Sequence, residues 1–150
     1  MGIVFLGPDG PLVLEAVEPV KMTALNQWVA RGQGHHFVAK RLRDAPAVLT
    51  PAAIAKLRGI GDTFIGKHYD LVFAWSDDRM YCSELVWKVY DRALDLEIGH
   101  PQHLSEFDLS DPGVHAKVVE RWHGPVPPDE VAISPGQMFA SSLLKTIYEQ

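Results

Sequence analysis

One stretch of the sequence decides most of the fold, Tyr81-Cys82-Ser83-Glu84-Leu85-Val86. It opens the most regular helical pattern in the chain, which runs from Tyr81 to about Leu96. Four apolar residues follow Cys82 at helical intervals and share its face: Leu85, Val86, Val89 and Ala93. Five charged residues fall on the opposite face, which we expect to be solvated: Glu84, Lys88, Asp91, Arg92 and Asp95. The pattern therefore places Cys82 on the buried side of a helix, in its first turn.

That position has chemical consequences for Cys82. The free N–H groups and the positive end of the helix dipole favour a thiolate over a thiol, and a thiolate is the form that acts as a nucleophile. The same N–H groups are suited to hold a developing oxyanion. A plainer interpretation makes Cys82 a small core residue that ends an apolar stripe, since most buried cysteines are inert. The helix pattern alone favours that plainer interpretation.

The composition bounds the class of protein. A length of 150 residues fits one compact domain, and we expect residues 1–150 to form it. Hydrophobic residues at 47% and charged residues at 22% exclude intrinsic disorder. Fourteen basic and nineteen acidic residues leave a net charge of −5, so the basic footprint of a nucleic-acid-binding protein is absent. No run approaches the roughly 18 apolar residues that cross a bilayer, so we expect no integral membrane segment.

The cysteine and histidine content argues against a metal site. A single cysteine, Cys82, excludes an internal disulfide and a zinc site built from cysteines. The seven histidines lack the spacing of a metal site, and we expect most of them to lie on the surface. Among the histidines of this sequence, only His36 is a serious candidate for a catalytic base. We therefore expect no metal site.

The first half of the chain is predicted to contain most of the strands. Residues 3–6 and 12–17 are rich in β-formers, and the turn residues 7–10 between them indicate a hairpin. Residues 20–22 are expected to continue this sheet. The alternation in residues 36–42 predicts a half-exposed strand, and residues 69–75 predict another.

Helices are predicted mainly after these strands. Thr23 is expected to cap a short helix that runs to about Ala30, and Thr50 caps a second helix that runs to Gly59 or Gly61. Further helices are expected around residues 111–122 and from Ser134-Pro135, with a loop at residues 125–128. Strands that come first and helices that follow indicate an α+β fold rather than a parallel α/β sheet.

Glu15 needs a partner. All its neighbours in residues 12–17 are apolar, so the strand is expected to be covered on both faces. A carboxylate buried there without a partner would cost several kcal/mol. A histidine imidazolium is one natural partner for it. The alternative is a strand end at which Glu15 reaches water or an arginine such as Arg41, and the residues favour neither choice.

The hairpin register says where such a histidine would lie. With residues 7–10 as the loop, Gly2 lies opposite Glu15. The residue immediately before Met1 would share the face of Gly2 and lie diagonal to Glu15, roughly 7 Å away. The sequence also opens almost at once with an apolar strand, so we expect that sequence belonging to this fold precedes Met1. The first residues lack the features of a signal peptide.

Several motifs resemble a known family. The chain resembles the permuted papain-like amidases of the YaeF/YiiX group, which are relatives of the NlpC-type cell-wall endopeptidases and of lecithin-retinol-acyltransferase-like enzymes. The likeness runs in order along nearly the whole chain, and its most specific element is the one around Cys82. The matching residues are Gly2-Ile3-Val4, Leu14-Glu15-Ala16, Gly66-Lys67-His68-Tyr69-Asp70, Phe73, Tyr81-Cys82-Ser83-Glu84-Leu85-Val86 and Ser134-Pro135.

The resemblance implies a circularly permuted papain-like fold, with a small antiparallel sheet or partial barrel packed against the cysteine-bearing helix and further helices. It implies that Cys82 is the nucleophile and that Glu15 orients the histidine. It also implies that Tyr69 lends its hydroxyl to the substrate or the oxyanion. The family histidine falls immediately before Met1, the same position to which the hairpin register points.

The implied activity is cysteine-dependent hydrolysis of an amide, in a small peptide or a cell-wall-type peptide, through a thioester on Cys82. This implied mechanism requires no metal and no organic cofactor. One alternative is a lipid acyl hydrolase or acyltransferase that uses the same thiol. The other is a catalytically degenerate domain that binds a peptide or a lipid. As written, the sequence indicates a cytoplasmic protein, and an upstream start with a signal peptide would make it secreted or periplasmic. The oligomeric state is open.

Overall fold

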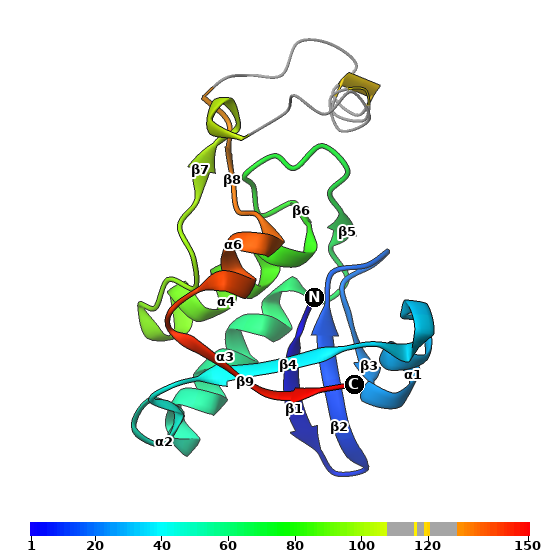
Figure 1. Ribbon diagram of the computed structural model, residues 1–150, viewed down its shortest axis with the longest axis vertical. Helices are drawn as coiled ribbons and strands as arrows, with labels where there is room; N and C mark the ends of the chain where they lie inside the picture. The colour runs from blue at the N-terminus through cyan, green and yellow to red at the C-terminus, as the bar shows by residue number, and fades with distance from the viewer. Residues whose placement is uncertain (108–115, 117–118, 121–128) are drawn as a thin grey trace.

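A computed structural model describes residues 1–107, 116, 119–120 and 129–150, and its chain begins with a three-stranded antiparallel sheet (Figure 1). The strands are β1 (Ile3–Gly7), β2 (Gly10–Glu15) and β3 (Lys21–Ala24), in the order β1-β2-β3. The first pair has the register Ile3↔Leu14 and Gly7↔Gly10, which confirms the predicted hairpin. Extended by one step, this register sets Gly2 opposite Glu15.

Helix α3 (Pro51–Phe64) packs against this sheet at a glycine. The side chain of Thr50 accepts a hydrogen bond from the N–H of Ala53, which confirms the predicted cap. The predicted end is wrong, because the helix continues through Gly59 and Gly61. A Cβ at Gly61 would stand 2.6 Å from Leu14 Cδ2. This glycine therefore serves a close approach of the helix to β2 rather than a helix end.

The cysteine-bearing helix is α4 (Cys82–Leu94), which packs along α3. The face predicted to be apolar is buried, and Leu85 and Val89 are both 0% exposed. Residues of β1, β2, α3 and α4 belong to one hydrophobic core, and Cys82 and Tyr69 pack against its edge. The sheet and the two helices thus share a single apolar interior.

Two local predictions are wrong. Thr23 does not cap α1 (Leu25–Ala30), whose N-cap is Ala24, because Thr23 lies in β3 and donates its hydroxyl to Glu15. The strand expected at residues 69–75 is only β5 (His68–Tyr69), which pairs in parallel with β6 (Arg79–Met80). Phe73 has a φ of 59°, a left-handed conformation that ends an extended strand.

The C-terminal residues add a helix and a strand. The helix predicted to start at Ser134-Pro135 is confirmed as α6 (Pro135–Ala140), and Ser134 caps it by accepting a hydrogen bond from the N–H of Gln137. The sequence did not predict β9 (Leu144–Glu149), which pairs with β4 (Val38–Leu42) in an antiparallel ribbon that Figure 1 shows in front of β1 and β2. The remaining elements are η1 (Gln33–His35), α2 (Ala45–Val48), β7 (Gln102–His103), η2 (Leu104–Glu106) and β8 (Val131–Ala132).

The architecture is α+β, with small antiparallel sheets packed against helices. The expected loop at residues 125–128 and most of the expected helix at 111–122 lie outside the described residues. In the part of the chain that is described, no helix has the length and apolar character to cross a membrane.

Candidate active site

Cys82 is the first residue of α4 and is partly exposed. Tyr81 precedes it in an extended conformation, with φ −102° and ψ 168°. The first N–H groups of any α-helix lack carbonyl partners within the helix, and Cys82 lies in this first turn of α4. The structure therefore places Cys82 as the sequence predicts, at a helix N-terminus on the edge of the core.

The two residues that flank Cys82 hold one peptide segment from both sides. The hydroxyl oxygen of Tyr81 accepts the N–H of Ile133 at 2.9 Å, and the hydroxyl of Ser83 donates to the Ile133 carbonyl at 2.7 Å. All of these groups are buried, and both side chains are 2% exposed or less. The first turn of α4 is thereby fixed to the chain that follows β8.

A buried ion pair holds the same turn from its other side. Lys88 Nζ lies 2.8 Å from Glu84 Oε1, and Glu84 Oε2 accepts the N–H of Tyr81 at 3.3 Å. Lys88 Nζ also donates to the Ser76 carbonyl at 2.5 Å and to Asp77 Oδ1 at 2.9 Å. The ammonium thus donates two hydrogen bonds and pairs with Glu84 by charge, while Glu84 Oε1 accepts no hydrogen bond within the described residues.

This pair corrects the expectation that Glu84 and Lys88 lie on a solvated face. Glu84 is 0% exposed and Lys88 is 2% exposed. The segment that precedes β6 covers them, since Trp75 packs on Trp87 and its ring lies 4.9 Å from the Lys88 ammonium. The charged side of the helix is thus covered at Glu84 and Lys88, whereas Arg92 and Asp95 are exposed as expected.

Burial dominates the electrostatics of this turn. It raises the pKa of Glu84 to about 7, because desolvation outweighs the nearby Lys88 ammonium, and Asp70 acts in the same direction. Burial also raises the pKa of the Tyr81 hydroxyl well above its ordinary value. At the half-exposed end of the network, hydrogen bonds from Arg92 hold the pKa of Asp77 below its usual range.

Glu15 is buried at the end of β2, and its partner is an arginine. Arg31 Nη2 lies 2.5 Å from Oε1 and 2.7 Å from Oε2, and Thr23 Oγ1 donates to Oε1 at 2.6 Å. Of the two partners weighed from the sequence, an arginine is therefore present, but it is Arg31 and not Arg41. Pairing with Arg31 was missed because that residue follows α1, and only the packing of α1 on β2 and β3 brings it to Glu15.

Tyr69 lies on β5, beside the chain that leads to Cys82. Its register partner is Met80, and the next residue, Asp70, donates its N–H to the Met80 carbonyl at 3.0 Å. Phe73 continues this contact, because its ring meets the Tyr81 ring edge to face with centroids 5.2 Å apart. Tyr69 and Cys82 are therefore on neighbouring segments. Within the described chain, the hydrogen bonds of the Glu15 side chain go to Thr23 and Arg31 and to neither of these residues.

The histidines of the described residues are engaged elsewhere. His36 is exposed, and its Nδ1 contacts the Gln150 carbonyl. His68 contacts the carboxylate of Glu18, which also accepts the N–H of Tyr69 at 2.8 Å. None of the hydrogen bonds in this part of the chain joins a histidine to Cys82.

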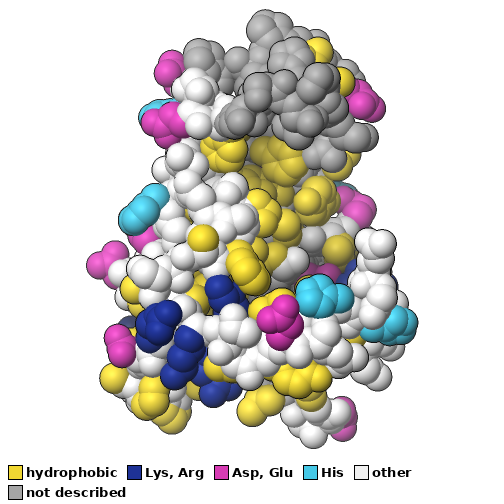
Figure 2. All heavy atoms as spheres, in the orientation of Figure 1, with side chains coloured by type: hydrophobic (Ala, Val, Ile, Leu, Met, Phe, Trp, Pro, Cys, Tyr) yellow, Lys and Arg dark blue, Asp and Glu magenta, His cyan; other side chains and the backbone are white. Residues whose placement is uncertain are grey.

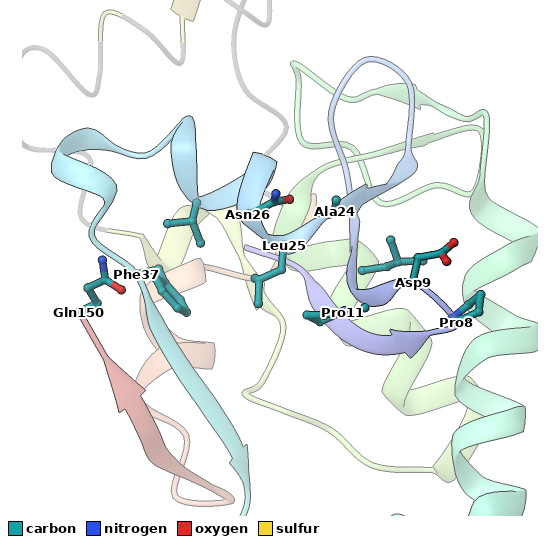
Figure 3. A pocket seen from close by; sticks show the side chains of 11 residues that line it. Pro8, Asp9, Pro11, Ala24, Leu25, Asn26, Phe37 and Gln150 are labelled. Carbon is teal, nitrogen blue, oxygen red and sulfur yellow. The ribbon is translucent and has the colours of Figure 1, made fainter.

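A pocket of about 730 Å³ lies near the β1–β2 turn and α1 (Figure 3). The β1–β2 turn, α1 and the end of β9 form it, and its lining includes Pro8, Leu25, Phe37 and Gln150. Neither Cys82, Glu15 nor Tyr69 lines this pocket. It therefore adds nothing to the candidate chemistry.

Comparison with known proteins places the chain in a family. Residues 1–148 match the family model described as permuted papain-like amidase enzyme, YaeF/YiiX, C92 family. The chain is 42% identical over 149 residues to the uncharacterized protein YiiX of Escherichia coli K12, covering 99% of this chain and 72% of that protein. A crystal structure of YiiX from Escherichia coli O157:H7 matches with a TM-score of 0.92 at 42% identity, covering 99% of this chain and 81% of that one.

The YiiX protein of that crystal structure is described as a metalloprotein. Within the described residues of this chain, no three His, Cys, Asp or Glu side chains converge closely enough to hold a metal ion. Glu15, the acid nearest to such a role, has an arginine and a threonine as partners. The described part of the chain does not fit a metal site, and no chemistry is assigned to one.

The match extends over almost the whole chain, and the solved structure has the same fold. The α+β architecture and the cysteine at the start of α4 agree with the sequence motifs that suggested the family. The chain belongs to the permuted papain-like amidases of the YaeF/YiiX family.

Proposed function

We propose that this protein hydrolyses an amide bond of a small peptide or a cell-wall-type peptide, with Cys82 as the nucleophile. The proposal rests on the way in which the neighbours of Cys82 hold it at the start of α4. A thiolate there attacks the amide carbonyl carbon, and the first N–H groups of α4 hold the oxyanion. The C–N bond breaks, the amine leaves with a proton from a histidine imidazolium, and water then hydrolyses the thioester to restore the thiol.

The proposed base is a histidine on the position that precedes Met1. The observed register supports this choice, because it sets Gly2 opposite Glu15 and the preceding residue diagonal to Glu15. Glu15 Oε1 accepts two hydrogen bonds within the described chain and Oε2 accepts one, which leaves Oε2 with room for an imidazole N–H. Glu15 would orient the ring, and Arg31 and Thr23 would hold the carboxylate in place.

Tyr69 completes the proposed site. Its backbone pairing with Met80 puts it on the segment beside Cys82, so its hydroxyl is proposed to donate to the substrate or the oxyanion. The family supports an amide substrate. The choice of small or cell-wall-type peptides comes from the family resemblance.

The first test is alkylation of Cys82, the single cysteine of the chain. Iodoacetamide should label it at neutral pH faster than it labels free cysteine, because the helix N-terminus stabilises the thiolate. Mass spectrometry of the intact protein follows the reaction. Labelling at or below the rate of free cysteine would argue against a nucleophilic role.

The second test measures hydrolysis of a panel of short peptides and muropeptides. Two extended chains are compared, one with Ala-His and one with Ala-Ala before Met1, each with and without Cys82→Ala. Hydrolysis only by the Ala-His chain with Cys82 intact is the expected result, and Glu15→Ala should reduce it. If the Ala-His chain instead forms an acyl-thioester from phospholipid, acyl transfer replaces the amidase proposal. Inactivity of that chain toward every substrate would favour a binding domain.

A further inference from the structure

The ribbon formed by β4 and β9 carries a cluster of cations on its outward face. Arg41 and Lys145 are direct register partners, so their side chains lie next to each other on one face. Leu42 and Leu144 point inward, because Leu42 is 4% exposed and both pack with the core. Arg43 and Leu143 come one step beyond, joined by the Arg43 N–H and the Leu143 carbonyl, and share the outward face with Arg41. We call Arg41, Arg43, Leu143 and Lys145 the basic ribbon face.

In the described part of the chain these cations lack ion-pair partners, although Asp44 directly follows Arg43 and is exposed. Within the described residues, Arg41, Arg43 and Lys145 form no ion pair, and the Arg43 side chain donates instead to the Ser142 carbonyl at 2.9 Å. Lys40 adds a fourth positive charge nearby, and its ammonium contacts the Phe139 carbonyl. Figure 2 shows the dark-blue side chains gathered at the end of the ribbon that lies toward α2. This concentration stands out in a chain whose net charge is −5.

The arrangement is unfavourable for the isolated chain. Like charges directly opposite each other on neighbouring strands destabilise a sheet. Such a pair becomes favourable when an anionic partner lies across both side chains. The basic ribbon face is therefore better explained by what it binds than by what it contributes to folding.

Exposed apolar side chains on the ribbon indicate which class of anionic partner the basic ribbon face binds. Leu143 is 42% exposed within the basic ribbon face, and Ile147 on the same strand is 47% exposed. A mixture of cations and exposed aliphatic side chains is suited to the surface of an anionic membrane. The basic side chains contact the anionic headgroups, and the aliphatic side chains enter the boundary between the headgroups and the acyl chains. Nucleic acid would use more cations and would give Leu143 and Ile147 no apolar partner.

We propose that the basic ribbon face docks the protein peripherally on an anionic lipid surface. Each basic residue near such a surface strengthens binding about fivefold, so the three cations of the face together give roughly a hundredfold preference over a neutral bilayer. The proposal does not depend on the proposed amidase activity, since it uses none of the candidate site residues. Docking would bring the proposed active site close to the membrane surface.

The test is co-sedimentation with vesicles of phosphatidylglycerol and phosphatidylcholine, compared with vesicles of phosphatidylcholine alone. We expect binding to the anionic vesicles at low salt and its loss at high salt, because surface charges are screened. Arg41→Ser/Lys145→Ser should weaken binding about 25-fold. The matched control, Lys21→Ser/Lys67→Ser, removes the same charge from other segments and should weaken it no more than about twofold.

Two further variants keep the test decisive. Arg41→Gln retains the side-chain length and should weaken binding about fivefold, while its thermal midpoint stays level or rises as the cross-strand repulsion falls. Cys82→Ala should bind vesicles like the parent chain. The proposal is overturned if anionic vesicles fail to bind at low salt, or if the control pair weakens binding as much as the ribbon pair does. It is also overturned if the face binds a DNA or RNA duplex and no vesicles.

Discussion

Replacing Lys88 by methionine tests the buried network beneath Cys82. Lys88 is 2% exposed, and its ammonium forms an ion pair with Glu84 and donates hydrogen bonds to Asp77 and the Ser76 carbonyl. Methionine has a similar length and fills most of the space without a charge. The change therefore isolates the electrostatic role of Lys88 from its packing.

One part of the cost does not depend on pH. The Ser76 carbonyl loses a buried hydrogen bond, which costs about 1–2 kcal/mol. Asp77 loses little, because it is half-exposed and keeps both of its hydrogen bonds from Arg92. We therefore expect a loss of about 1–2 kcal/mol in the free energy of unfolding at about pH 6.

The other part depends on pH through Glu84. Burial raises the pKa of Glu84 from 4.5 to about 7, so the folded state binds more protons than the unfolded state between these values, and stability falls as pH rises through that window. Above about pH 7 the parent carboxyl is ionised beside Lys88, and this cost stops growing. The variant lacks the cation, so the carboxyl stays protonated and the cost continues to grow by about 1.4 kcal/mol per pH unit. The total loss should reach about 2.5–3.5 kcal/mol near pH 8.

Urea unfolding followed by tryptophan fluorescence at about pH 6, 7 and 8 measures these differences. Arg92→Gln is the matched control, since it removes a cation from the same network at an exposed pair and should cost less than about 1 kcal/mol at each pH. A loss for Lys88→Met that is equal at pH 6 and pH 8 would refute the account of Glu84. A loss of stability that becomes smaller as pH rises would contradict the direction of the pH dependence expected for Glu84.

Two further predictions concern the parts of the fold that support the sheet. Gly61→Ala should lower the free energy of unfolding by about 1–2 kcal/mol, because its new Cβ would meet Leu14 at 2.6 Å. Gly59→Ala should raise the free energy of unfolding by about 1 kcal/mol, since nothing lies within 4 Å of that position. An equal effect of the two changes in urea unfolding would show that the approach of α3 to β2 is not tight. Arg31→Gln should cost about 1–2 kcal/mol by leaving the Glu15 carboxylate, which is 3% exposed, without its cation. A thermal midpoint equal to that of the parent would mean that Glu15 needs no arginine.

Local patterns in the sequence predicted much of the fold. The hairpin register depends on a short turn and was correct to the residue, the cap at Thr50 formed as expected, and a helix starts at Ser134-Pro135 as predicted. The buried face of α4 followed from helical spacing. These features depend on residues within a few positions of one another, so a sequence pattern contains their physical cause.

The predictions that were wrong depend on segments that meet across the chain. Helical spacing alone assigned Lys88 to solvent, because it carries no information about the residues before β6 that cover that face. Gly61 was interpreted as a helix end, but it lies inside α3 where Leu14 packs closely against it. Thr23 resembled a cap, and its hydroxyl was instead taken by Glu15.

The sequence by itself determined the family, the helix that begins at Cys82 and the requirement that Glu15 have a partner, since a carboxylate among aliphatic neighbours is costly unless it is paired. Only the tertiary structure decided that this partner is Arg31, that Glu84 and Lys88 are buried together, and that β4 pairs with β9 to gather the basic ribbon face. The physical reason is that the partner of a buried charge depends on which groups lie near it in the folded state. Packing between segments that are distant in the sequence determines which groups those are.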